Sequence, residues 1–184
     1  VLEAQTILGR CVPPHASEGT DTGLVVGYVQ SGKTLSFTTV IALARDTGYR
    51  LIILIPGIGV LLKSQAEKEL LAALGVDSPN SPWVHYENPS LANGDVNSIR
   101  SKLGVWDKKD TREENRKGVL ITVLKHHARL RSLVEVLRAI DLTGVPTLII
   151  DDEADQASLN NCTRTNIVKG ETKVSATYNW ISQL

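Results

Sequence analysis

The sequence predicts an α/β fold in which helices cover both faces of a mostly parallel sheet. Three observations predict it: short apolar runs alternate with longer helical patterns, a glycine-bearing turn follows the first apolar run, and acidic residues follow the last one. This alternation is typical of βαβ units, because parallel strands need a crossover connection that is usually a helix. With 184 residues, the chain has about the length of a single domain.

The first half of the chain contains two strand–helix units. Within the first helix, apolar residues recur at helical spacing, and the second helix ends at Gly75, a residue that commonly ends helices. The predicted elements are a strand over 24–26, a turn over 27–32, a helix over 33–45, a strand over 50–55 and a helix over 61–74.

The second half begins with a change of character. Residues 77–118 are first rich in Ser, Pro, Asn and Gly and then mostly charged, which predicts an insertion or a long surface loop. Residues 1–22 are expected to form an N-terminal extension, and residues 161–184 have no clear pattern. The remaining predicted elements are a strand over 119–123, a helix over 127–140 and a strand over 147–150.

Composition excludes several classes of protein. The 20 basic and 20 acidic residues cancel, so a nucleic-acid partner would have to be met by a local patch. Cys11 and Cys162 are far apart and lack zinc-ligand spacing, which predicts a reducing, cytoplasmic location. The longest apolar run, over 51–62, is too short to span a bilayer, so no membrane is expected. Because the chain has no Met, even at position 1, we expect it to be a piece of a longer protein.

Residues 27–34 match G-x-x-x-x-G-K-[ST], the phosphate-binding loop or Walker A motif, between a predicted strand and a predicted helix. Glycines allow backbone amides to turn toward phosphates, and the N-terminus of the next helix attracts anions. Lys33 would reach the β and γ phosphates of ATP, and the Thr34 hydroxyl would bind Mg²⁺. The predicted nucleotide-binding residues are Gly27, Gln30, Ser31, Gly32, Lys33 and Thr34.

An acidic segment directly follows the last predicted strand. Asp152 would hold Mg²⁺ through water, opposite Thr34, and Glu153 would orient or deprotonate the water that attacks the γ phosphate. The alternative is an acidic helix start, which the helix dipole also favours. The phosphate-loop motif upstream favours the catalytic interpretation, with Lys33, Asp152 and Glu153 as catalytic residues.

These motifs carry a resemblance to a known family. Residues 152–155 read D-E-A-D, the Walker B or DEAD-box motif, and together with residues 27–34 they resemble the first RecA-like lobe of superfamily-two helicases and translocases. The stretches 23–34, 48–53 and 150–158 look more narrowly like the Z-one domain group, which are endonuclease-associated, helicase-like ATPases of bacterial DNA-related systems. The resemblance covers about residues 23–160.

The resemblance implies a three-layer RecA-like P-loop NTPase lobe that binds ATP and Mg²⁺ in a nucleic-acid-stimulated ATPase that acts on DNA. It also implies a second RecA-like lobe, outside this sequence, that supplies an arginine finger, so this lobe alone should hydrolyse ATP poorly. A nucleotide-binding regulatory or assembly module without turnover remains the alternative. A small-molecule kinase is disfavoured, because no arginine-rich lid segment follows the last strand.

Some positions leave choices open. Asp151 is an extra acid where most D-E-A-D strands are apolar, so Asp151 or Asp152 could be the magnesium residue. Gln65 and Lys125 follow the second and third strands, where the family contacts the nucleic-acid backbone; ordinary solvated side chains are an equal alternative. Residues 175–177 spell the family's S-A-T motif, but a polar segment precedes them, so we interpret this match as a decoy.

Overall fold

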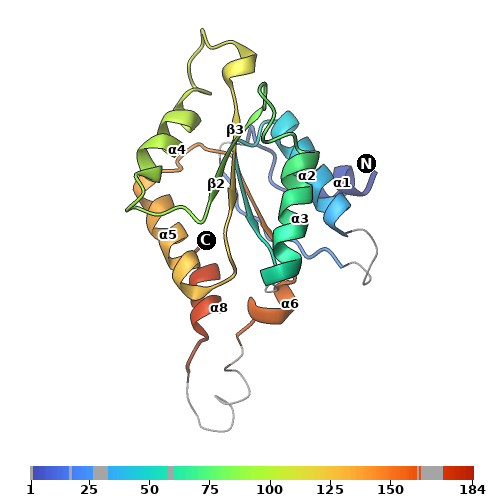
Figure 1. The fold of residues 1–184 in the computed structure, drawn as a ribbon, viewed down its shortest axis with the longest axis vertical. Helices are drawn as coiled ribbons and strands as arrows, with labels where there is room; N and C mark the ends of the chain where they lie inside the picture. The colour runs from blue at the N-terminus through green and yellow to red at the C-terminus, as the bar shows by residue number, and fades with distance from the viewer. Residues whose placement is uncertain (1, 17, 27–32, 58–59, 161, 163–171) are drawn as a thin grey trace.

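The computed structural model describes the chain except for residues 1, 17, 27–32, 58–59, 161 and 163–171 (Figure 1), and for the helical residues 33–35, 60–66 and 156–157 it describes the backbone alone. The strands are β1 (Leu51–Ile55), β2 (Trp83–Glu87), β3 (Gly118–Thr122) and β4 (Thr147–Asp151). The helices are α1 (Leu2–Leu8), α2 (Lys33–Thr47), α3 (Val60–Ala73), α4 (Asp95–Gly104), the 3₁₀ turn η1 (Glu113–Asn115), α5 (His127–Ile140), α6 (Ala154–Ala157) and α8 (Ala176–Ile181).

The four strands form one parallel sheet in the order β2-β3-β1-β4. Strand β1 is central, with Leu51 beside Val119 of β3 and beside Thr147 of β4. All five residues of β1 are buried, as expected for a parallel strand covered on both faces. The predicted α/β class with a mostly parallel sheet is therefore confirmed.

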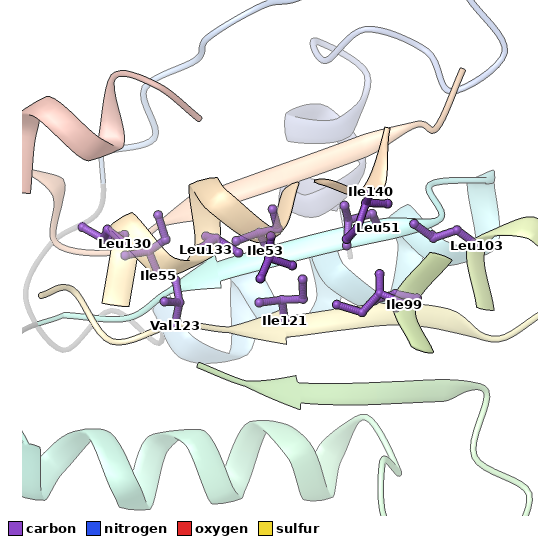
Figure 2. Packing of buried hydrophobic residues seen from close by; sticks show 12 residues of the cluster. Leu51, Ile53, Ile55, Ile99, Leu103, Ile121, Val123, Leu130, Leu133 and Ile140 are labelled. Atoms are coloured by element: carbon purple, nitrogen blue, oxygen red, sulfur yellow. The ribbon is translucent and has the colours of Figure 1, made fainter. Parts of the chain in front are cut away.

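Helices cover both faces of the sheet. On one face, α4, α5 and α8 pack over a cluster that includes Ile53 and Ile121 (Figures 1 and 2). On the other face, α2 and α3 cover Ile52, Leu54 and Leu120, and α1 packs against α2. Neighbouring residues of a strand point to opposite faces, so one apolar run supplies both cores. The result is a three-layer arrangement that agrees with the predicted RecA-like lobe.

The predicted strand over 24–26 is wrong. Leu24, Val25 and Val26 are 84%, 65% and 85% exposed and lie outside the sheet. Apolar and β-branched residues favour a strand only when neighbouring strands provide backbone and side-chain partners. Among the described residues, no strand lies beside this segment to provide such partners.

Residues 77–118, expected to be an insertion or long loop, contribute to the fold instead. They include β2, which forms one edge of the sheet, and α4, which packs against α5. The apolar signal was weak, because α4 buries only Ile99 and Leu103, one helical turn apart, and β2 is fully buried only at Trp83. An edge strand and a helix with a narrow apolar stripe need few apolar residues.

The S-A-T sequence at 175–177 begins a helix, which agrees with its interpretation as a decoy. Ser175 is the N-cap of α8, and its hydroxyl oxygen accepts a hydrogen bond from the Tyr178 amide at 3.3 Å. Helix α8 in turn packs against α5.

Substitution of this cap should destabilise the protein modestly. We expect Ser175→Ala to lower the free energy of unfolding by about 1 kcal/mol, because the Tyr178 amide loses its acceptor. Urea unfolding followed by circular dichroism measures this loss, and Ser175→Asp, which keeps a cap acceptor, is the matched control. Equal losses in both variants would contradict a capping role.

Candidate functional site

The acidic segment lies at the carboxyl edge of the sheet. Ile55, the last residue of β1, is paired with Asp151, the last residue of β4. The chain then turns through Asp152 and Glu153 into α6, which lies at the lower end of the sheet in Figure 1. The Asp152 amide donates a hydrogen bond to the Ile55 carbonyl at 2.9 Å, which ties this turn to the central strand. The carboxyl edge of a parallel sheet is the usual place for a ligand in α/β proteins.

Glu153 has an unusual backbone conformation. Its φ and ψ are 52° and 44°, in the left-handed region that non-glycine residues adopt at a cost of roughly 1–2 kcal/mol. The Asp152 carboxylate accepts a hydrogen bond from the Glu153 amide at 3.0 Å through Oδ1. The exposed Glu153 side chain is therefore presented at the sheet edge by a strained but hydrogen-bonded turn.

Gly57, just after β1, lies against the Glu153 carboxylate. A Cβ atom at position 57 would stand 1.9 Å from Glu153 Oε2 and 2.5 Å from its Cδ, closer than such atoms can approach. The missing side chain of Gly57 therefore leaves the space that this carboxylate occupies. Glycine is commonly found where another group approaches the backbone closely.

Lys125 joins the acidic turn to the segment that follows β3. Its side chain is fully buried, and its Nζ lies 2.7 Å from Asp151 Oδ1, at an angle that makes an ion pair rather than a directed hydrogen bond. The ammonium also donates hydrogen bonds to the carbonyl oxygens of Asp152 and Glu153, the second at 3.1 Å. A side chain so buried and engaged is unsuited to contact a nucleic-acid backbone, so the predicted nucleic-acid contact of Lys125 is wrong.

The position of Lys125 bears on which aspartate could hold magnesium. The Asp151 carboxylate faces the Lys125 ammonium, which already balances its charge. Asp152 follows the strand, and its carboxylate supplies the hard oxygen donors that Mg²⁺ prefers. The geometry therefore favours Asp152 over Asp151 for this role.

The phosphate-loop residues Gly27, Gln30, Ser31 and Gly32 lie outside the described residues. Lys33 and Thr34 are the first two residues of α2, and Gln65 lies within α3, but the side chains of all three are outside the described part as well. Helix α2 therefore contains the last two residues of the predicted motif.

Other groups at this edge have structural roles. The His126 ring nitrogen accepts a hydrogen bond from the Ala128 amide at 3.3 Å and caps α5, so the adjacent histidines 126 and 127 mark a helix start. Where the structure describes side chains, three or more His, Cys, Asp or Glu residues nowhere gather as a metal site. Nucleotide sites usually hold Mg²⁺ through one or two carboxylates and the phosphates, and Asp152 fits that pattern.

Two features of the site were missed by sequence reasoning, namely the Lys125 contacts and the space at Gly57. The signal for the first was Asp151 itself, because a carboxylate that ends an apolar strand and is partly buried needs a cationic partner. The signal for the second was the Pro56-Gly57 pair after β1, interpreted only as the end of a strand.

Comparisons with protein families, curated proteins and solved structures found no match to this chain. Among the described helices, none has both the length and the apolar character needed to cross a membrane.

Proposed function

We propose that this chain is the ATP-binding lobe of a helicase-like, nucleic-acid-stimulated ATPase that acts on DNA. The observation that carries the proposal is the placement of Asp152 and Glu153 in a held turn at the carboxyl edge of a parallel sheet. The phosphate-loop motif at 27–34, whose last two residues lie in α2, supports the same function.

The proposed chemistry assigns phosphate binding, Mg²⁺ binding and activation of water to separate groups. Backbone amides of the loop and Lys33 would bind the phosphates, and Thr34 and Asp152 would hold Mg²⁺, which supplies charge neutralisation at the β and γ phosphates. Glu153 would orient the attacking water and accept its proton. Its exposure at the sheet edge, beside Gly57, supports this assignment because water must reach the carboxylate.

The proposed partners follow from the same reasoning. Phosphoryl transfer of this kind is completed by an arginine finger worth roughly 10³–10⁵ in rate, and a second RecA-like lobe would supply it. We therefore expect this chain alone to bind nucleotide weakly and to hydrolyse it slowly, and we expect DNA to stimulate turnover when the second lobe is present. Rapid multiple turnover by this chain alone would contradict the proposal.

Calorimetric titration of Mg-ATP and Mg-ADP tests nucleotide binding directly. We expect binding to the wild-type chain and none to Lys33→Ala, because Lys33 is the cation that meets the phosphates. Lys68→Ala, in the same chain but outside the motif, is the control and should bind like wild type. If Lys33→Ala binds Mg-ATP as well as wild type does, the phosphate-loop interpretation is wrong. If the wild-type chain binds Mg-ATP but does not hydrolyse it, even with DNA and a second lobe, a regulatory module is favoured.

A further inference from the structure

We infer that Lys125 is a positioning residue that holds the turn bearing Asp152 and Glu153 in its working conformation. The expected effect of Lys125 on ATP hydrolysis rests on the proposed function. Its expected effect on the conformation of the turn does not depend on that function. It gives Lys125 a role different from the nucleic-acid contact expected from its place in the sequence.

The ammonium of Lys125 makes one ion pair and donates two hydrogen bonds. The ion pair is with Asp151 Oδ1 and the hydrogen bonds go to the Asp152 and Glu153 carbonyls, so all three partners belong to consecutive residues. The side chain is fully buried, which weakens competition from water and strengthens each contact. A single cation therefore engages both the charged side chain and the backbone of the acidic turn.

These contacts cross the central strand. Lys125 follows β3 and the acidic turn follows β4, while β1 lies between the two strands and is paired with both. The turn is attached to β1 by the bond from the Asp152 amide to the Ile55 carbonyl. Lys125 connects the same turn to the segment that follows β3.

The conformation of Glu153 explains why such an attachment is needed. A non-glycine residue in the left-handed region persists only where surrounding contacts hold it there. Without Lys125, the Glu153 carbonyl loses the ammonium donor, and the residue can relax toward an ordinary conformation. Its carboxylate would then leave the space beside Gly57.

The test compares four variants of the chain. Lys125→Met removes the ammonium, Asp151→Asn keeps an acceptor for it, and Lys125→Met/Asp151→Leu removes both charges together. Arg131→Met removes a cation from the exposed Arg131–Glu135 pair and is the matched control. Amide hydrogen exchange over residues 152–157 reports on the conformation of the turn. Single-turnover hydrolysis with protein in excess over Mg-ATP reports on catalysis. Calorimetric titration measures the affinity for Mg-ATP.

We expect Lys125→Met to speed exchange over residues 152–157 and to lower the hydrolysis rate about 100-fold, with affinity for Mg-ATP much less changed. The double variant should regain stability but keep fast exchange and slow hydrolysis, because the two carbonyls still lack their donor. Asp151→Asn should stay within about tenfold of the wild-type rate, and Arg131→Met should match wild type.

Recovery of slow exchange and hydrolysis in the double variant would overturn the inference, because Lys125 would then serve only to balance the charge of Asp151. Unchanged exchange in Lys125→Met would overturn it as well. If the wild-type chain binds no nucleotide while exchange responds as expected, the proposed function fails and the structural role of Lys125 stands.

Discussion

Gly57→Ala should lower the single-turnover rate of ATP hydrolysis about 100-fold, while folding and Mg-ATP binding remain nearly unchanged. The new methyl group would stand 1.9 Å from Glu153 Oε2, so one of the two groups must move. The carboxylate is the end of a flexible side chain and moves more easily than the backbone, so the loss falls on catalysis rather than on stability. The φ of Gly57 lies outside the left-handed region, so alanine is tolerated by the backbone itself.

The matched control for this prediction is Gly104→Ala. Gly104 ends α4 and has nothing within 4 Å of the position of an added Cβ atom, so we expect wild-type hydrolysis and stability. Circular dichroism and calorimetric titration check the fold and the affinity of both variants. Wild-type hydrolysis by Gly57→Ala would contradict the assignment of Glu153 as the residue that orients water, and equal loss of affinity and rate would indicate damage to nucleotide binding.

The layers of the fold were largely predictable from the sequence because the buried strands carry their own signal. Strands β1 and β3 are fully buried and carry continuous apolar runs, so these runs identified them within one residue of their ends. Helix α5 has one apolar face and was predicted with its observed bounds. In such elements the apolar residues that form the sequence pattern are the same residues that pack in the core.

The errors occurred where tertiary partners decide the outcome. Residues 24–26 are as apolar as a buried strand, but a strand also needs a neighbour for its backbone groups. Conversely, β2 contains His85 and Glu87 yet joins the sheet, because β3 provides its hydrogen-bond partners and only Trp83 is fully buried. Local composition does not contain this information.

The candidate site divides in the same way. Asp152 and Glu153 could be predicted because the two residues are adjacent in the sequence and form part of one recognisable motif after a strand. The contacts of Lys125 with the acidic turn join residues more than 25 positions apart, and no spacing rule connects them. The sequence placed Lys125 after a strand, but only the parallel order of β3, β1 and β4 brings its ammonium to the end of β4.

Lys125→Met should lower the free energy of unfolding by about 3 kcal/mol, the lower end of the roughly 3–5 kcal/mol expected when one partner of a buried ion pair is removed. Methionine fills a similar volume, so the loss comes mainly from the Asp151 carboxylate, which keeps its charge without its counter-ion. The lower end applies because the Asp151 side chain is 20% exposed and water can partly solvate it. Urea unfolding measures the loss as a lower midpoint with an unchanged slope.

Two comparisons show whether this loss comes from burial of the charge. Arg131→Met breaks an exposed pair whose side chains are 64% and 39% exposed, and we expect it to lose less than about 0.5 kcal/mol. Lys125→Met/Asp151→Leu should recover more than half of the loss of the single variant, because replacement of a buried ion pair by apolar residues removes the uncompensated charge. A loss in Lys125→Met no larger than that of Arg131→Met would contradict a buried pair. If the double variant lost as much as the single variant, the stabilisation would come mainly from the bonds to the Asp152 and Glu153 carbonyls, and holding the acidic turn would then be the principal contribution of Lys125 to the fold.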